Sequence, residues 1–489
     1  MVIRLRRPFA LVAALLTATL LTPLAPASAQ PDRYAAIDAY LRDRMEETHA
    51  PGLAYAVVGP DGPLHQRSWG TDGNGERVTA ETPFLWGSVA KPVTATAVMT
   101  LVQAGRLGLD DRVADHLPEF RFGGPAHASQ VTVRHLLEQT AGIPGSATSK
   151  VTDCFGAGCP GAAGRLGALD DVAPLGPPGT EYAYSSANYL VLTAVVESVT
   201  GRPFAEHLRR TVLDPAGMDG AIADAASARK ENLPPGHRYL WGVPSATDGF
   251  DDHGAGYGYL GGDLDDLAAF ASLQLRGGKT PEGRTVLTDE SVRLMRQDGR
   301  LGQGYGLGWR VGGLDAPLND AIWHTGGSPG YSALLLLLPR QNVALVLHQN
   351  IYGLLQDGAV MQAGFGAAEL LAGGTPNTAP SASLYLLAVW ATTGTAAALV
   401  LAAGRSAFLL RRPPVATTRR RRLAVTAGWT LAGAIPLILA VGVARQMGLG
   451  PLAIWAPDLL IGGSVAAAAG AATIILRGAL AIRSHRHSP

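Results

Sequence analysis

The sequence predicts an α+β (mixed α/β) fold for an exported domain, residues 30–380, followed by three transmembrane helices. Three observations support this prediction. Strand-like patterns lie at both ends of the exported domain, helical patterns fill its middle, and three long apolar runs follow it. Because strands and helices do not alternate one by one, we expect an antiparallel sheet built from both ends of the domain. Helices would flank this sheet, and a helical lobe would be inserted between its two halves.

Residues 1–29 have the pattern of a signal peptide. Three arginines near the start precede an apolar run over residues 9–21, and Ala27-Ser-Ala29 supplies the small residues of a cleavage site. Cleavage after Ala29 would release the chain outside the cytoplasm. The alternative is an N-terminal anchor that is not cleaved.

The elements of the exported domain follow from hydrophobic periodicity and turn residues. A strand hairpin is expected around Pro60-Asp-Gly62, and an irregular lobe over the Gly-, Pro- and Ala-rich residues 142–180. The expected strands are 53–59, 64–70, 306–311, 321–324, 331–338 and 343–348, and the expected helices are 34–47, 88–107, 131–139, 189–199, 264–275 and 361–371.

The C-terminal part, residues 381–489, has the composition of a membrane domain. Residues 384–403, 423–444 and 459–476 are uncharged, apolar runs of about 20 residues, which is the length that crosses a bilayer. Seven arginines and no acidic residue lie between the first two runs, and further arginines follow the third. The positive-inside rule therefore predicts a multi-pass protein of the cell membrane, with residues 30–380 outside the cytoplasm and the lipid bilayer as a partner. The alternative is that these runs are buried helices of a soluble domain.

Composition excludes several classes of function. A formal net charge of +1 argues against nucleic acid as a main partner. The two cysteines, Cys154 and Cys159, are candidates for a small loop disulfide, with free thiols as the alternative. No histidines accompany them in a zinc-site pattern, so we expect no metal and no cofactor. Gly256-Tyr-Gly258-Tyr-Leu-Gly261 matches a dinucleotide fingerprint, but without a strand-turn-helix context it indicates a bend.

Ser88-Val-Ala-Lys91 is the most informative motif. It follows an apolar run and opens a helical pattern, so the Lys91 amine and the Ser88 hydroxyl would share one face of a helix. A partly desolvated lysine can act as the base that a serine nucleophile needs. The chain has only four lysines among its 40 basic residues, and an arginine could not do this work because it stays protonated. A helix-capping serine with a surface lysine is the alternative, and Ser227-Ala-Arg-Lys230, in a polar stretch, is interpreted in that way.

Two further segments carry candidate site residues. Tyr184 precedes an apolar helix and can point its phenol into a cleft, where a cation such as Lys91 would lower the phenol pKa. Trp323-His324-Thr325-Gly326-Gly327 lies at the end of a strand, where exposed N–H groups can bind an oxyanion. Taken singly, the tyrosine also fits aromatic packing at a helix start, and the histidine fits a structural role.

Together and in this order, these segments resemble the serine β-lactamase and penicillin-binding-protein superfamily, especially its class C β-lactamase, DD-peptidase and esterase branch. That family carries Ser-x-x-Lys, Tyr-x-Asn and Lys- or His-x-Gly. The corresponding residues here are Ser88-Val-Ala-Lys91, Tyr184-Ser-Ser186 and His324-Thr-Gly326. The resemblance covers residues 34–350 and implies a β-lactamase/transpeptidase-like fold.

The resemblance also implies a role for each site residue. Ser88 would be the acylated nucleophile, Lys91 and Tyr184 would share the general-base work, and His324 would orient the substrate and the Tyr184 phenol. The backbone N–H groups of Ser88 and Gly327 would form the oxyanion hole. The remaining substrate-binding candidates are Ser186, Thr325 and Gly326.

Two positions depart from the family pattern. Ser186 replaces the usual asparagine with a shorter hydroxyl, which would weaken amide binding unless Asn188 takes over. His324 replaces lysine and is mostly uncharged at neutral pH, so a substrate carboxylate would be held less strongly.

We therefore expect a membrane-anchored serine hydrolase that acts on a small-molecule or cell-wall peptide substrate. D-amino-acid peptides, β-lactams and esters are all candidate substrates, and peptidase- or esterase-like activity is favoured over a dedicated β-lactamase. The alternative is a penicillin-binding-like sensor or scaffold without turnover. The sequence does not indicate an oligomeric state.

Overall fold

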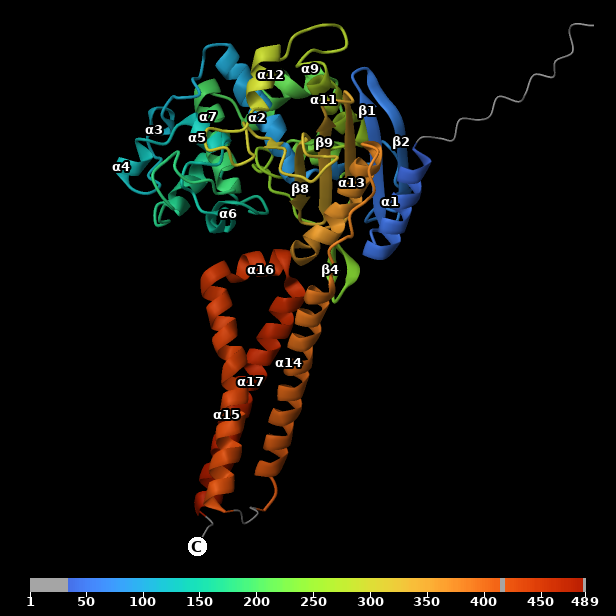
Figure 1. The fold of residues 1–489 in the computed structure, drawn as a ribbon. Coiled ribbons are helices and arrows are strands. Elements are labelled where there is room, and N and C mark those ends of the chain that lie inside the picture. Colours follow the sequence, from blue (N-terminus) through green and yellow to red (C-terminus); the bar gives the residue numbers. More distant parts are fainter. Residues whose placement is uncertain (1–33, 414–417, 487–489) are drawn as a thin grey trace, which may run out of the picture.

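A six-stranded antiparallel sheet forms the centre of the globular domain, which spans residues 34–380 (Figure 1). The computed structural model describes residues 34–413 and 418–486, so the predicted signal peptide lies outside the described residues. The strand order is β2-β1-β10-β9-β8-β7. The strands are β1 (Gly52–Gly59), β2 (Gly62–Gly70), β7 (Arg310–Val311), β8 (Ile322–Ser328), β9 (Tyr331–Leu338) and β10 (Val343–Gln349). The sheet is therefore built from both ends of the domain, which confirms the predicted fold class.

The two faces of the sheet bury different clusters of side chains. Leu334 and Leu336 of β9 face α1 (Ala35–Thr48) and α13 (Asp357–Leu371) on one side. Ala333 and Leu335 alternate with them and face α11 (Leu264–Leu275) and the helical lobe on the other side. Because successive strand residues point to opposite faces, a strand that is apolar throughout is buried on both sides.

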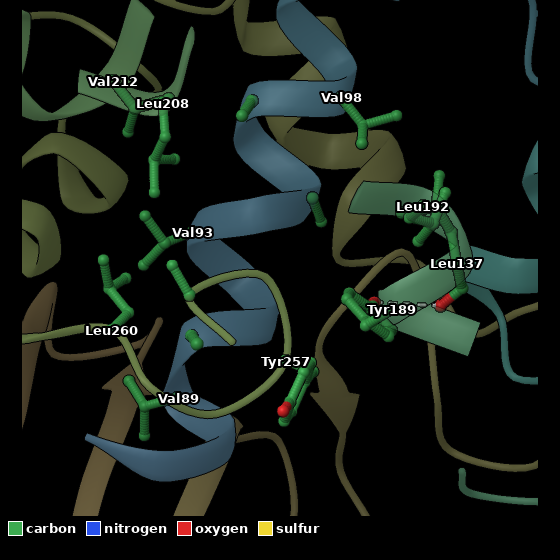
Figure 2. Close-up of a cluster of buried hydrophobic side chains, with 14 of the residues drawn as sticks. Val89, Val93, Val98, Leu137, Tyr189, Leu192, Leu208, Val212, Tyr257 and Leu260 are labelled. Atoms are coloured by element: carbon green, nitrogen blue, oxygen red, sulfur yellow. Dashed lines mark hydrogen bonds between the residues drawn. The ribbon is translucent and has the colours of Figure 1, made fainter. Parts of the chain in front are cut away.

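The helical lobe is packed around α2 (Ala90–Gln103) and α7 (Ser186–Thr200). Figure 2 shows Val93 of α2 on the side of Leu208 and Val212, with Tyr189 of α7 on the other side of the helix. Helix α2 is buried on nearly every side, which is typical of a central helix. The remaining helices of the domain are α3 (Val113–His116), α4 (Pro125–Ala128), α5 (Val133–Leu137), α6 (Thr148–Val151), α8 (Phe204–Leu208), α9 (Asp214–Ala216), α10 (Ala225–Lys230) and α12 (Asp289–Met295).

The largest difference from the sequence prediction lies at residues 306–311, where only β7 is a strand. Gly304 and Gly308 have φ angles of 71° and 83°, which break the extended run. A side chain at Gly308 would lie 2.6 Å from the Ala95 side chain, so glycine lets this loop pack against α2. The helix predicted to start at residue 189 starts at Ser186, and the helix predicted for 131–139 shortens to α5. The hairpin of β4 (Gly236–Leu240) and β5 (Val243–Thr247) and the two-residue strands β3 (Phe84–Leu85) and β6 (Gly261–Gly262) were not predicted.

Four helices form a C-terminal helical bundle beneath the globular domain: α14 (Ser383–Leu410), α15 (Arg419–Met447), α16 (Leu449–Trp455) and α17 (Pro457–Arg486) (Figure 1). The three predicted spans lie within α14, α15 and α17, each of which is long and apolar enough to cross a membrane. Their outward side chains are apolar and strongly exposed, such as Leu401 at 74% and Ile438 at 70%. The short α16 was not predicted.

The globular domain contacts the bundle through the turn between β4 and β5. Trp241 donates from its backbone N–H to Asp458 at the start of α17 (3.1 Å) and from its indole to Thr393 of α14 (2.8 Å). The Tyr385 hydroxyl of α14 donates to the same Asp458 carboxylate (2.5 Å). These polar contacts, of which the bond from Tyr385 to Asp458 is buried, fix the position of the domain on the helices.

Candidate active site

Ser88 and Lys91 lie where a 3₁₀ turn (Gly87–Val89) runs into α2. The Lys91 amine is fully buried and within hydrogen-bonding distance of three oxygens: Ser88 Oγ (2.8 Å), Ser186 Oγ (3.1 Å) and the Tyr257 carbonyl (2.9 Å). A neutral amine has two hydrogens and one lone pair. Ser186 and Tyr257 can accept the two hydrogens, which leaves the lone pair for the Ser88 hydroxyl proton.

The electrostatic environment of Lys91 favours this neutral form. Burial lowers the pKa of Lys91 well below its usual value, and the nearby Arg310 guanidinium lowers it further. In its neutral form, a buried lysine can accept a proton from a serine hydroxyl.

The Tyr184 phenol adjoins the same pair. Its ring centroid is 5.0 Å from Lys91 Nζ and 5.3 Å from the Arg310 guanidinium. Burial nevertheless raises the pKa of Tyr184, and the contact with Ser88 and the charge of Arg310 offset this only in part. The sequence-based expectation of a lowered phenol pKa is therefore wrong, because burial outweighs the nearby cations. The phenol stays protonated and is a hydrogen-bond donor.

Ser186, which stands where the family pattern has asparagine, is part of the site. It is the first residue of α7, and its hydroxyl accepts from Lys91 (3.1 Å). Asn188, the alternative amide, is buried; its side chain donates to Gln139 Oε1 (2.5 Å) and to the Ser185 carbonyl (3.3 Å). Asn188 therefore does not take over at the site, and the smaller Ser186 remains in contact with Lys91.

His324 lies on β8 behind the wall of the site and is only 1% exposed. Its Nδ1 is 2.6 Å from the Thr325 carbonyl and its Nε2 is 3.3 Å from the Tyr305 hydroxyl. Burial lowers the pKa of His324 well below its usual value, and the charge of Arg310 and that of Lys91 when protonated lower it further, so the ring is neutral. A neutral ring donates from Nδ1 to the carbonyl and accepts at Nε2 from Tyr305. His324 thus contacts the aromatic layer around Tyr184, its ring 6.0 Å from that of Tyr184, and it is not positioned to touch a substrate.

The glycine pair brings β8 directly against the serine turn. A side chain at Gly326 would lie 1.8 Å from the Trp86 carbonyl oxygen and 2.7 Å from the Ser88 nitrogen, and one at Gly87 would lie 2.4 Å from the Gly327 nitrogen. Only glycines permit this approach. The backbone nitrogens of Ser88 and Gly327 therefore lie side by side at the surface of the site, which is the arrangement that an oxyanion hole requires.

Ser88 and its neighbours at the surface of the site face one cavity of about 500 Å³, whereas the buried Lys91 and His324 lie behind its lining. Its lining includes Ser88, Tyr184, Ser186, Tyr257 and Gly327. The volume falls in the range of small-molecule sites. No cluster of three metal-ligating side chains occurs among residues 34–413 and 418–486.

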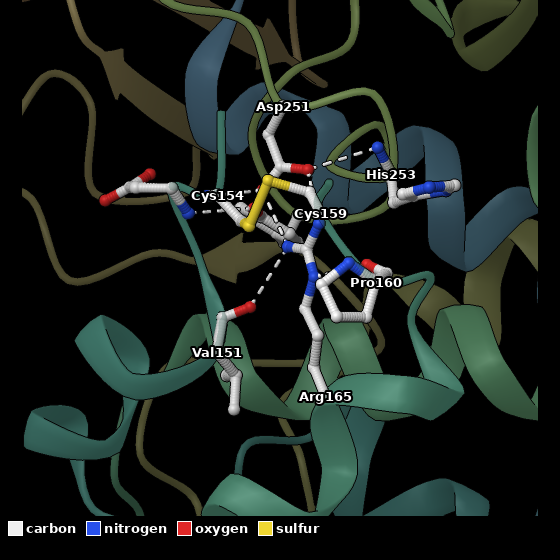
Figure 3. The surroundings of a disulfide bond; sticks show 9 residues. Val151, Cys154, Cys159, Pro160, Arg165, Asp251 and His253 are labelled. Carbon is white, nitrogen blue, oxygen red and sulfur yellow. Dashed lines mark hydrogen bonds and ion pairs between the residues drawn. A yellow bond between two sulfur atoms is a disulfide. The ribbon is translucent and has the colours of Figure 1, made fainter. Parts of the chain in front are cut away.

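A buried network behind the cavity was not predicted from the sequence. Asp251 accepts two hydrogen bonds from Arg165 (2.6 and 2.7 Å) and one from the Tyr257 hydroxyl. Next to it, Cys154 and Cys159 form the disulfide that was expected from the sequence, with Cα atoms 5.7 Å apart, and the Cys154 N–H also donates to Asp251 (Figure 3). The glycines around Tyr257 did indicate a bend near the site, and the carbonyl of that bend binds Lys91. Arg310 gave no recognisable signal, since it belongs to none of the three motifs.

Comparisons with known proteins agree with this geometry. The sequence model of one family, Beta-lactamase, matches residues 37–363, which end before α14. Penicillin-binding protein 4 of Amycolatopsis lactamdurans is 34% identical over 321 residues, covering 62% of this chain and 82% of that protein. Protein flp of Staphylococcus aureus is 24% identical over 343 residues, covering 64% of this chain and 62% of that protein.

Solved structures share the fold of the globular domain. The octameric penicillin-binding protein homologue from Pyrococcus abyssi superposes with a TM-score of 0.58 at 22% identity, covering 70% of this chain and 78% of that one. EstCE1, described as a hydrolase with promiscuous acyltransferase activity, gives a TM-score of 0.56 at 22% identity, covering 65% and 93%.

Proposed function

This chain belongs to the Beta-lactamase family, in the superfamily of serine β-lactamases and penicillin-binding proteins, and from that premise we propose that it is a membrane-anchored serine hydrolase working through a Ser88 acyl-enzyme. The observation that carries the proposal is the buried Lys91 amine, 2.8 Å from Ser88 Oγ in a setting that favours its neutral form. A capping serine with a surface lysine would have an exposed amine instead.

Each step of the proposed reaction uses a group that contacts the cavity or the serine. Ser88 Oγ attacks the substrate carbonyl, and its proton moves to the Lys91 lone pair. The N–H groups of Ser88 and Gly327 stabilise the resulting oxyanion. The proton then passes from Lys91, by way of the Tyr184 hydroxyl, to the leaving group as the carbonyl–leaving-group bond breaks. Water attacks the acyl-enzyme by the reverse proton path and releases Ser88.

The polar groups of the site favour peptidase- or esterase-like substrates over β-lactams. A neutral, buried His324 supplies no positive charge for a substrate carboxylate, and Ser186 supplies no amide for a substrate carbonyl. EstCE1, described as a hydrolase with promiscuous acyltransferase activity, is similar in fold, and Penicillin-binding protein 4 is similar in sequence. D-amino-acid peptides and simple esters are therefore the substrate classes to test first.

We also propose that the globular domain lies outside the cytoplasm and that α14, α15 and α17 cross the cell membrane. The arginines between α14 and α15 and those at the end of α17 support this orientation through the positive-inside rule. The apolar, exposed surfaces of the three helices support a lipid environment.

The alternative function, a penicillin-binding-like sensor or scaffold without turnover, was suggested by the Ser186 departure. The Ser186 hydroxyl contacts Lys91 in the place where an amide would otherwise be expected, which favours a working proton path. Turnover of any ester would exclude the sensor function.

The full-length protein in detergent, with Ser88→Ala as its control, tests the proposed function. It is incubated with a fluorophosphonate and with a fluorescent penicillin, and the labelled peptide is mapped by mass spectrometry. Fluorophosphonate on Ser88, absent in the variant, is the expected result, and penicillin on the same residue would add a penicillin-recognising site. A folded protein that takes up no label would refute the acyl-enzyme.

A further inference from the structure

The short helix α16 is part of the wall of the active-site cavity, although it belongs to the helical bundle. It joins α15 to α17 at the end of the bundle nearest the globular domain (Figure 1). Pro451 and Trp455 of α16 line the same cavity as Ser88 and Tyr184. The bundle therefore does more than hold the domain, because one of its connections shapes the space in which a substrate binds.

Specific contacts hold α16 in this place. The Trp455 indole donates to Asp153 Oδ2 (2.9 Å), and its ring packs edge-on against Tyr352 with centroids 5.9 Å apart. The same Asp153 accepts from the Tyr259 hydroxyl (2.7 Å). Both Asp153 and Tyr259 also line the cavity. A tryptophan that is anchored through its indole presents the rest of its apolar surface in a fixed orientation.

The chemistry of α16 is that of a membrane interface. Its sequence, Leu449-Gly-Pro-Leu-Ala-Ile-Trp455, has no charged or hydrogen-bonding side chain except the indole, and Leu449 is 60% exposed. Because α16 connects two helices of membrane-spanning length, it lies at the depth where such helices leave the lipid. Leu354 of the globular domain, which is 45% exposed, also contributes apolar surface to the cavity. Pro451, Trp455 and Leu354 thus give the cavity an apolar side toward the bundle, where the Asp153 carboxylate is bound by the Trp455 indole and the Tyr259 hydroxyl.

We propose that the substrate is an amphiphile of the outer leaflet, whose carbonyl reaches Ser88 while its apolar chain lies against α16. Trp455 is then a specificity-determining residue that the membrane domain contributes to the site. This inference rests on the proposed function, since it needs an acylated Ser88 and a membrane-inserted bundle. The occupant is inferred from connectivity, because α16, which supplies this wall, directly joins helices of membrane-spanning length whose exposed side chains are apolar. A substrate without an apolar group would gain nothing from this wall.

An active-site-directed photoprobe tests the placement of the chain. The probe is an alkyl fluorophosphonate with a dodecyl chain that ends in a diazirine, applied to the full-length protein in lipid nanodiscs. Ser88 Oγ displaces fluoride from phosphorus, so that an O–P bond forms, the P–F bond breaks, and the hydroxyl proton leaves through Lys91 to solvent. Light then inserts the chain end into whatever it touches. Cross-links from labelled Ser88 to residues 449–455 are expected.

The outcomes separate the two proposals. Ser88 labelled but cross-linked only to the globular domain would overturn the role of α16 and leave the hydrolase intact. Absence of label on Ser88 would refute the proposed function and, with it, this inference.

Kinetics supply a second test that does not depend on cross-linking. In nanodiscs, the wild type is expected to prefer a dodecanoyl ester to a butanoyl ester in kcat/KM, and Trp455→Ala should reduce that preference by about tenfold because a large apolar contact is lost. Trp455→Phe keeps an aromatic ring but not the bond to Asp153, and it should retain most of the preference. Trp390→Ala, which removes an exposed tryptophan of α14, is the matched control and should change neither ester. If Trp455→Ala lowers kcat/KM equally for both esters, α16 only holds the globular domain in place, and the inference would be wrong.

Discussion

Replacing Arg310 by methionine should move the acid limb of Ser88 acylation to higher pH. Arg310 is outside the three motifs. Its guanidinium nevertheless lies near the Tyr184 ring, and the Lys91 amine lies near the same ring. Its positive charge makes protonation of Lys91 less favourable and lowers the pKa of that amine. Without this charge the pKa of Lys91 rises toward its usual value, so a higher pH is needed to obtain the neutral amine that takes the serine proton.

The structure sets the size of the effect. Lys91 Nζ is 5.0 Å and the Arg310 guanidinium 5.3 Å from the same ring centroid, so the two cations are no more than about 10 Å apart. Two unit charges at about 10 Å repel by about 1.7 kcal/mol at an effective dielectric constant near 20, which corresponds to about one pKa unit. Arg310 is partly exposed, and solvent screens part of this repulsion. We therefore expect a shift of about 0.5 to 1 pH unit.

The assay is the rate of fluorophosphonate labelling of Ser88 between pH 5 and pH 10 in the full-length protein. Arg310→Met should be slower than wild type below the limb by about threefold to tenfold and equal to it at high pH. Arg310→Lys keeps the charge and serves as the matched control, with its limb near that of the wild type. A limb that stays in place in Arg310→Met, or moves to lower pH, while labelling at high pH is intact, would refute the assignment of Lys91 as the base.

Two further predictions follow from contacts around the site, and a third follows from a histidine buried in the central sheet. Ser186→Ala removes one of three hydrogen-bond partners of the Lys91 amine and should slow fluorophosphonate labelling of Ser88 by about fivefold. Ser186→Asn restores the amide of the family pattern and should increase labelling by penicillin. If the two variants label equally with both probes, Ser186 does not have this role beside Lys91. Asp251→Asn leaves the buried Arg165 without its carboxylate, so it should lower the free energy of unfolding by about 3–5 kcal/mol. It should also slow acylation, because Asp251 binds the Tyr257 hydroxyl and the Tyr257 carbonyl binds Lys91. An unchanged melting temperature would count against a stabilising role of this network. His348 is buried against Phe84 with a pKa lowered to about 3, so the unfolded chain takes up a proton below about pH 6.5 that the folded chain does not accept until about pH 3. This costs about 2 kcal/mol of stability at pH 5, and His348→Leu should lose less melting temperature than wild type between pH 7 and pH 5; equal losses would argue against it.

The sequence predicted those parts of the fold and site that depend on short-range patterns. Helix α11 and strand β9 were predicted at their observed bounds, because strong periodicity and clear turn residues frame them. The Ser88–Lys91 contact was also predictable, because residues three apart share a helix face. Strand patterns at the two ends of the domain also predicted a sheet built from both ends, although the specific pairing of β1 with β10 was not predicted.

The remaining features depend on contacts between segments that are distant in sequence. Arg310 acts on Lys91 and Tyr184 across the site, and no local pattern relates these positions. The direction of the Tyr184 pKa shift depends on burial, which only the packed lobe determines. Helix α16 is too short and too uniformly apolar to stand out beside α15 and α17. Its place at the cavity arises only when the bundle and the globular domain are assembled.

The pairing of β1 with β10 also sets the order of events during biosynthesis. The register joins Leu53 to Gln349, so about 300 residues of chain must emerge from the ribosome before the central pair of strands can form. Until then β1 has only its hairpin partner β2, and an isolated hairpin is not stable. Only α13 and a short connection separate β10 from α14, the first helix of membrane-spanning length. The domain therefore completes its sheet at about the time that α14 is being made, so a change that slows strand pairing should also disturb the packing of the domain on the C-terminal helical bundle.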